Sequence, residues 1–258
     1  MSAAIYSKPH TQEQLKIFDF IKYGEKHGII DAVAGSGKTT TIIDCADHIN
    51  GDSLVMFCAF NNSIANEIRK RFAIKGKQRV HVKTIHALGF DILKTNTANT
   101  YKLDIKKYDK IIEAGLRQGV FDEEIEELLE INKIKARAAN RFEESLLRNF
   151  RNSFKHILID LSGKFRLTLT KSDLTAVKEL ITHYNILNEK KTEQSTFDAE
   201  TKVYYKINEK IIEKGNQISD ALLEIDFSDM LYLPYIKKLS PIHKYDFLFI
   251  DECQDLSR

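Results

Sequence analysis

Residues 31–42, DAVAGSGKTTTI, constrain the fold more than any other stretch of this sequence. The apolar run 28–33 leads into them and has the length of a buried strand, while the residues from Lys38 onward have helical spacing. Between these segments lie Gly35 and Gly37, which can adopt backbone conformations that other residues rarely adopt. A strand, a glycine-rich turn and a helix in this order predict a loop that binds phosphate groups.

The chemistry of such a loop assigns a role to each of its residues. Backbone N–H groups point at phosphate oxygens, and the helix N-terminus adds a partial positive charge. Lys38 is expected to reach the outer phosphates, and the Thr39 hydroxyl is expected to bind Mg²⁺. Ala32 replaces the first glycine of the general pattern, so a chance glycine-rich turn is the alternative. The residues predicted to bind the nucleotide here are Ala34, Gly35, Ser36, Gly37, Lys38, Thr39 and Thr40.

A second apolar run, FLFID at 247–251, ends at two adjacent carboxylates, Asp251 and Glu252. Two acids at the end of a buried strand are costly unless they meet a cation. A phosphate-binding loop requires an acid at the end of a neighbouring strand. Asp251 is therefore predicted to hold Mg²⁺ through its water shell, and Glu252 to orient and deprotonate an attacking water. The alternative is a carboxylate that caps a following helix.

The arrangement of apolar segments predicts an α/β fold. Strands are expected at 28–33, 54–60, 80–85 and 247–251. Helices are expected at 12–23, 38–49, 62–74 and 87–96. Near-continuous apolar strands that alternate with helices are typical of a parallel sheet with helices on both faces.

Residues 101–221 differ from the rest of the chain because helical spacing dominates them, as in 122–150. Only 164–170, KFRLTLT, alternates like a strand, and it could equally be an extended connection. The sequence therefore predicts an α/β core domain formed by 1–100 and 222–258, interrupted by a mainly helical insertion at 101–221. The insertion accounts for the long separation of Lys38 from Asp251 (251 − 38 = 213 residues).

Composition places the chain among soluble globular proteins, with 43% hydrophobic and 29% charged residues. No apolar run approaches the length of a membrane span, and residues 1–14 contain no apolar signal core. An intracellular location is expected, in the cytoplasm or nucleoid, the nucleus, or a host cell. Cys45, Cys58 and Cys253 lack metal-type spacing and are expected to be reduced thiols.

Charge is unevenly distributed although the net charge is only +2. Residues 67–83 contain seven Lys or Arg and a single acid, whereas 121–130 contain six acids and no base. Such runs usually mark solvated helix faces. A basic run beside a phosphate site is also compatible with a path for nucleic acid.

AVAGSGKT (32–39) and DECQD (251–255), with the segments between them, resemble the first half of a superfamily 1 DNA helicase of the UvrD/Rep type. The resemblance covers about 10–95 and 222–258 and implies a P-loop, RecA-like core domain with a helical insertion. It also implies ATP and Mg²⁺ as cofactors and movement along single-stranded DNA, in the 3′ to 5′ direction. Within the family, the segments AFNNSIANEI and KTIHALG resemble most the branch that includes F-box helicases and phage UvrD-like enzymes.

The same resemblance implies further site residues. HTQEQ (10–14) resembles the adenine-recognising Q motif, in which Gln14 would read the base. Segments 57–72 and 82–93 resemble motifs Ia and Ib, whose loops contact single-stranded DNA in the family. The matching positions are Phe60, Asn61, Thr84 and His86. A core phenylalanine and a strand-capping histidine are the alternatives. Asn62 stands where the family often has lysine, so a phosphate contact there is not carried over.

The resemblance also implies a second RecA-like domain that supplies an arginine finger, with Gln254 linking the terminal phosphate to its movement. The motifs expected after DECQD are absent, so the chain is expected to be the N-terminal part of a helicase that is inactive or very slow alone. Two other functions remain open. One is a catalytically incomplete module that binds nucleotide or DNA and regulates a partner, and the other is a small-molecule kinase with the helical block as a lid.

Overall fold

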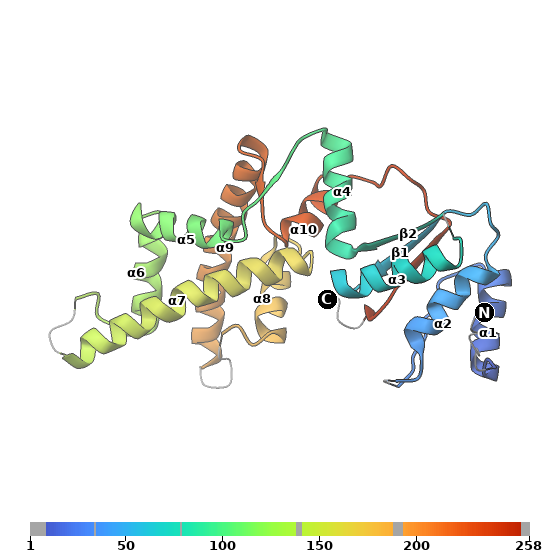
Figure 1. Ribbon diagram of the computed structural model, residues 1–258. Coiled ribbons are helices and arrows are strands. Elements are labelled where there is room, and N and C mark those ends of the chain that lie inside the picture. Colours follow the sequence, from blue (N-terminus) through green and yellow to red (C-terminus); the bar gives the residue numbers. More distant parts are fainter. Residues whose placement is uncertain (1–8, 34, 78, 138–140, 188–192, 254–258) are drawn as a thin grey trace. The chain divides into compact units, whose positions relative to one another are not determined.

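The computed structural model describes residues 9–253 apart from 34, 78, 138–140 and 188–192. The chain divides into two compact units. The core unit consists of Met1–Leu88 and Ile242–Leu256, and the helical unit consists of Gly89–Pro241. Figure 1 follows the chain through both units. None of the described helices is both long and apolar enough to cross a membrane.

A three-stranded parallel sheet with the order β2-β1-β5 forms the centre of the core unit (Figure 1). The strands are β1 (Val55–Ala59), β2 (Val80–Thr84) and β5 (Phe247–Ile250). Every residue of β1 is buried, as expected for a strand with a neighbour on each side. Three of the predicted strands are present, and the predicted α/β class, a parallel sheet flanked by helices, is confirmed.

The fourth predicted strand, at 28–33, is not formed, and that prediction is wrong. Ile29 and Val33 are 89% and 79% exposed. An apolar run becomes a strand only where a neighbouring strand offers hydrogen bonds along its edge. In the described residues β2 and β5 pair on one side only, and 28–33 pairs with neither, so its apolar character alone did not decide strand formation.

Helices cover one face of this sheet. The core unit contains α1 (Gln12–Tyr23), α2 (Lys38–Cys45), the short η1 (Ala46–His48) and α3 (Asn62–Ile74). Apolar side chains of α2 and α3 form one buried cluster with Phe57, Ala59 and Val82 of the sheet. Helix α1 packs against α2 and η1, where the Phe18 and His48 rings stack with centroids 4.3 Å apart.

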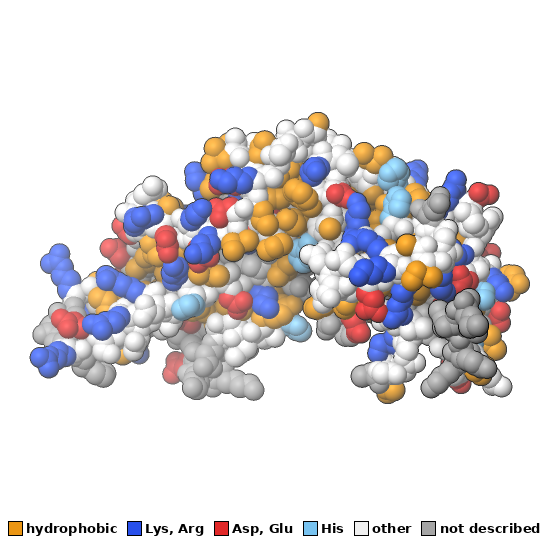
Figure 2. Space-filling view, in the orientation of Figure 1, with side chains coloured by type: hydrophobic (Ala, Val, Ile, Leu, Met, Phe, Trp, Pro, Cys, Tyr) orange, Lys and Arg blue, Asp and Glu red, His pale blue; other side chains and the backbone are white. Residues whose placement is uncertain are grey.

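The basic stretch 67–83 is used mainly to hold the core unit together. Arg69 donates two hydrogen bonds to the carbonyl oxygen of Val82, at 3.0 and 2.7 Å. Lys75 forms ion pairs with Asp44 and Asp47, at 2.7 and 2.6 Å. In the region of α3 in Figure 2, basic side chains accordingly lie next to acidic ones. Arg69 and Lys75 are thus paired within the core unit, although both residues are exposed.

The helical unit is built around α9 (Gln194–Ala221), which packs against α5, α6, α7 and α8. These helices are α5 (Lys107–Arg117), α6 (Asp122–Ile131), α7 (Arg141–Leu167) and α8 (Leu174–His183). Helix α7 continues through residues predicted to be a strand or an extended connection. Leu158, Leu161 and Phe165 recur at helical spacing and are all buried, which explains why the helix extends to Leu167.

The helical unit is longer at both ends than the predicted 101–221 insertion. It includes most of α4 (Ile85–Thr97), the parallel pair β3 (Lys102–Leu103) and β4 (Glu224–Ile225), and α10 (Asp229–Ile236). Helices α4 and α10 approach so closely that a Cβ atom at Gly89 would lie 2.1 Å from the carbonyl oxygen of Met230. This backbone contact joins the beginning and the end of the unit.

A cluster of buried charges fixes the turn before α10. Lys107 Nζ lies 2.7 Å from Asp229 Oδ2. Arg166 Nη1 lies 2.6 Å from Asp226 Oδ1 and 3.0 Å from Asp229 Oδ1, and its guanidinium lies 3.4 Å from the centre of the Tyr108 ring. Two cations thus balance two carboxylates, and loss of any one would leave a buried charge without its partner.

Two glycines provide a matched test of packing in the helical unit. A Cβ atom at Gly215 in α9 would lie 2.1 Å from the Tyr108 hydroxyl, whereas one at Gly163 in α7 would meet nothing within 4 Å. We expect Gly215→Ala to lower the free energy of unfolding by about 1–3 kcal/mol through overpacking. Gly163→Ala should raise it by about 0.5–1 kcal/mol because alanine favours the helix. Urea unfolding followed by circular dichroism measures both, and equal effects would contradict the prediction.

Candidate functional site

The site begins where the parallel strands end. In the sheet register Ala59 lies beside Thr84, and Cys58 lies beside Ile250. The backbone N–H of Asp251 extends this ladder by donating to the carbonyl oxygen of Cys58, at 3.0 Å. The predicted residues that follow β1, β2 and β5 are therefore at the same edge of the sheet, where parallel α/β sheets bind their ligands.

Two glycines of the glycine-rich loop have backbone conformations that favour glycine. Gly35 and Gly37 have φ angles of 78° and 88°, in the left-handed region, and a side chain at either would be strained. Gly37 directly precedes α2, and no side chain in the described part of the chain caps this helix. The N–H groups of its first turn are thus available to an anion.

The Lys38 side chain contacts the backbone at the start of the predicted phosphate-binding loop. Its Nζ donates to the carbonyl oxygens of Ala32 and Val33, at 2.7 and 3.4 Å. The ammonium is therefore held against the backbone at the start of the loop by neutral carbonyl acceptors. Phosphate oxygens, which carry more negative charge, would compete well for the same hydrogen bonds.

Thr39 and Asp251 are brought together although 212 positions separate them. Thr39 Oγ1 donates to Asp251 Oδ2 at 2.8 Å, and the Asp251 residue is only 4% exposed. A hydroxyl and a carboxylate are hard oxygen donors that suit Mg²⁺. Within the described residues no cluster of three or more His, Cys, Asp or Glu side chains could hold a metal. Water and phosphate oxygens would complete the shell, as is usual for Mg²⁺.

Glu252 occupies an unusual backbone conformation directly after Asp251. Its φ angle is 53°, a left-handed value that costs a residue with a side chain about 1–3 kcal/mol. Six other described residues that carry side chains, among them Ala98 and Lys133, have similar φ angles, so the angle alone does not mark a functional site. Ala34 and Gln254, also predicted as site residues, lie outside the described residues.

Gln14 links α1 to the phosphate loop. Its Oε1 accepts a hydrogen bond from the Thr11 N–H at 2.9 Å, and its Nε2 donates to Thr41 Oγ1 at 2.8 Å. Thr41 was not identified from the sequence, because one threonine in the run TTT carries no signal by itself. Its position three residues after Lys38, on the same helix, is what brings it to the site.

The four predicted DNA contacts differ in their surroundings. Phe60 is 52% exposed. Asn61 caps α3 by accepting from the Ile64 N–H at 2.9 Å, and Thr84 accepts from the Ala87 N–H at 3.2 Å while remaining buried. Burial lowers the pKa of His86. The structure therefore gives Asn61 and Thr84 helix-capping roles, and Phe60 has the most accessible side chain for a ligand.

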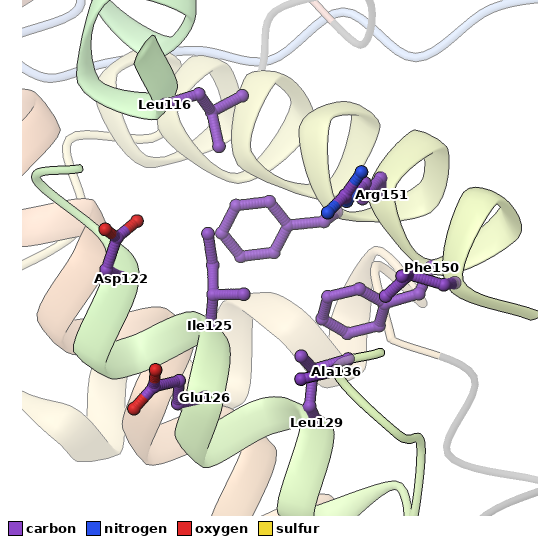
Figure 3. A pocket seen from close by; sticks show the side chains of 10 residues that line it. Leu116, Asp122, Ile125, Glu126, Leu129, Ala136, Phe150 and Arg151 are labelled. Atoms are coloured by element: carbon purple, nitrogen blue, oxygen red, sulfur yellow. The ribbon is translucent and has the colours of Figure 1, made fainter. Parts of the chain in front are cut away.

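The two best-formed pockets lie elsewhere, in the helical unit. One of about 410 Å³ lies between α6 and α7, and Figure 3 shows Ile125 and Phe150 in its wall with Asp122 and Glu126 at its side. The other, of about 490 Å³, lies between α5 and α9. Neither is lined by a predicted site residue.

A comparison with known protein families identifies the class of protein in which this site occurs. The UvrD/REP helicase N-terminal domain matches residues 11–258. The chain belongs to this family. No curated protein and no solved structure matches the chain. Membership confirms the resemblance drawn from AVAGSGKT and DECQD, and it implies ATP-dependent DNA unwinding, nucleotide and divalent-metal use and DNA binding as general properties of UvrD/Rep helicases.

The histidines of the core unit predict how its stability varies with pH. Burial is the main cause that lowers the pKa values of His48, His81 and His86 below 6.5 in the folded state. Protonation therefore favours the unfolded state. The contribution of these histidines to the free energy of unfolding is fully present above pH 6.5 and is lost as the pH falls through their folded-state pKa values. We expect urea unfolding at pH 5.5 to show a lower free energy than at pH 7.5, with a smaller difference for His86→Gln. An unchanged difference in that variant would contradict the role of His86.

Proposed function

We propose that this chain provides the ATP-binding, DNA-contacting half of a helicase motor that moves along single-stranded DNA in the 3′ to 5′ direction. The observation that carries the proposal is the 2.8 Å hydrogen bond between Thr39 and Asp251. It connects the phosphate loop to the acid at the end of β5, which is the pairing that ATP hydrolysis by a P-loop protein requires.

In the proposed reaction, the N-terminus of α2 and Lys38 bind the outer phosphates of ATP. Thr39 and Asp251 hold Mg²⁺, which when bound neutralises charge on the phosphates. Glu252, which directly follows Asp251, orients the attacking water and accepts its proton. Most of the rate acceleration then comes from positioning and charge neutralisation.

DNA contact is proposed at the same edge of the sheet. The exposed Phe60 ring follows β1 and can stack on a base, a contact that tolerates any sequence. Asn61 follows β1 by two residues and His86 follows β2 by two residues, and the last residues of the two strands, Ala59 and Thr84, are register partners. Because nucleotide and DNA would contact loops of one sheet, closure around ATP can move the loops that hold DNA.

The remaining step, coupling to motion, requires a second RecA-like domain. In this proposal an arginine of that domain completes the ATP site, and Gln254 transmits the state of the terminal phosphate to it. The chain alone would bind nucleotide but hydrolyse it very slowly. If the protein that joins it to such a domain binds ATP without hydrolysing it, the catalytically incomplete regulatory module is the better assignment.

Nucleotide binding can be tested on this chain. ATP with Mg²⁺ should raise the unfolding temperature, because a ligand that binds only the folded state stabilises it. Lys38→Ala should abolish the increase, and Asp251→Asn should abolish the part that depends on Mg²⁺. Lys26→Ala, which removes an exposed lysine of the core unit, is the control and should respond like the wild type. An increase that persists in Lys38→Ala would exclude the assigned phosphate site.

The DNA contact can be tested by fluorescence anisotropy with a labelled oligothymidylate. Phe60→Ala should weaken binding by about 1–3 kcal/mol, the usual contribution of stacking on one base. Tyr23→Ala is the matched control, since Tyr23 is 79% exposed in the same unit but lies on α1. In the protein that contains both core domains, Phe60→Ala should also reduce the stimulation of ATP hydrolysis by DNA. Equal loss of affinity in the two variants would argue against a specific contact.

A further inference from the structure

Thr41 connects the two ends of the proposed nucleotide site. It lies on α2, is 3% exposed, and was not among the site residues predicted from the sequence. Its Oγ1 lies 2.8 Å from Gln14 Nε2 and 3.0 Å from the carbonyl oxygen of Gly37. One hydroxyl thus touches both the glutamine proposed to read the base and the loop proposed to bind phosphate.

In the hydrogen bonds that link Thr11, Gln14, Thr41 and Gly37, the donor and the acceptor of each bond follow from the groups involved. The Thr11 backbone N–H can only donate, so the atom of Gln14 that faces it, at 2.9 Å, must be Oε1. The amide nitrogen of Gln14 is therefore the atom that faces Thr41. The Gly37 carbonyl can only accept, so it takes the single O–H of Thr41, whose oxygen then accepts from Gln14.

We propose that Thr41 is a positioning residue that locks the Gln14 amide in one orientation and thereby makes the site select adenine over guanine nucleotides. The inference rests on the proposed function and deepens it, because it names the residue that sets base preference. Thr41 does not touch the base in this scheme. It acts by holding Gln14 from one side while Thr11 holds it from the other.

When Thr11 and Thr41 hold it, the Gln14 amide still has one acceptor position and one N–H group that these two contacts do not use. Oε1 has a second lone pair and Nε2 has a second hydrogen. Adenine presents an N6–H donor next to the N7 acceptor, which matches this pair, whereas guanine presents two acceptors, O6 and N7. Guanine would therefore place O6 against the Gln14 oxygen. A Gln14 amide that could rotate would be able to donate its N–H group to O6 or to N7 of guanine. Discrimination against guanine therefore depends on the contacts with Thr11 and Thr41 that hold the amide in one orientation.

The Thr41 hydroxyl also donates to the carbonyl oxygen of Gly37 in the phosphate loop. The Gly37 carbonyl accepts from the Thr41 N–H at 2.9 Å as well as from the Thr41 hydroxyl. The backbone bond remains when the side chain is changed. Thr41→Val should therefore alter base preference much more than it alters the binding of phosphate by Lys38 and the loop.

Base preference can be measured by displacement of mant-ATP from this chain by ATP or by GTP, each with Mg²⁺. We expect the wild type to prefer ATP and Thr41→Val to reduce the ratio of the two dissociation constants by about tenfold, the effect of one hydrogen bond of about 1.4 kcal/mol. Thr41→Ser keeps the hydroxyl and should keep the ratio. Thr97→Val is the control, because it removes the same type of bond, from a threonine hydroxyl to the carbonyl of Leu93 at 2.8 Å, in the helical unit.

The outcomes separate this inference from the proposed function. If the wild type does not bind mant-ATP, or if Lys38→Ala binds it equally well, the proposed function fails and the inference with it. If binding requires Lys38 but the wild type shows no preference, or Thr41→Val keeps its preference, only the inference fails. Circular dichroism checks the fold of each variant, and Thr41→Ala replaces Thr41→Val in the same comparison if the valine variant does not fold.

Discussion

The parallel pairing of β1 with β5 is the interaction on which the site depends. It joins Val55–Cys58 to Phe247–Ile250 across the whole helical unit. Only this pairing places Asp251 beside Thr39, since nothing local in the chain could bring them together. Pairings between such distant segments form slowly, because the loop between them must be closed first. The geometry of the candidate site is thus a property of the completed core unit rather than of either motif.

The helical unit reduces this difficulty by closing on itself. Its first and last segments meet in the β3–β4 pair and in the contact of Gly89 with Met230. The buried cluster around Asp229 adds ionic hydrogen bonds from α5 and α7 at the same end. An insertion whose ends are held together returns the chain close to where it left. The strands of the core unit can then pair as though the insertion were a short loop.

The sequence predicted those parts of the structure that local chemistry determines. The bounds of α1 and α3 follow from helical periodicity, and the Thr39–Asp251 pair follows from the chemistry of phosphate and magnesium. The strand at 28–33 was wrongly predicted because strand formation depends on pairing with another strand, which no local pattern reveals. Thr41 was missed for a related reason: its role comes from a contact with another helix. Tertiary partners, not residue types, account for the differences.

The left-handed backbone of Glu252 has a consequence for how this family should respond to selection. Glycine or asparagine would relieve the conformation at once, so the fold alone would favour either of them at this position. A laboratory selection for thermal stability without any demand for activity would then be expected to lose the glutamate early. Retention of glutamate under a demand for activity would identify this position as one where the requirements of the reaction and of the fold conflict.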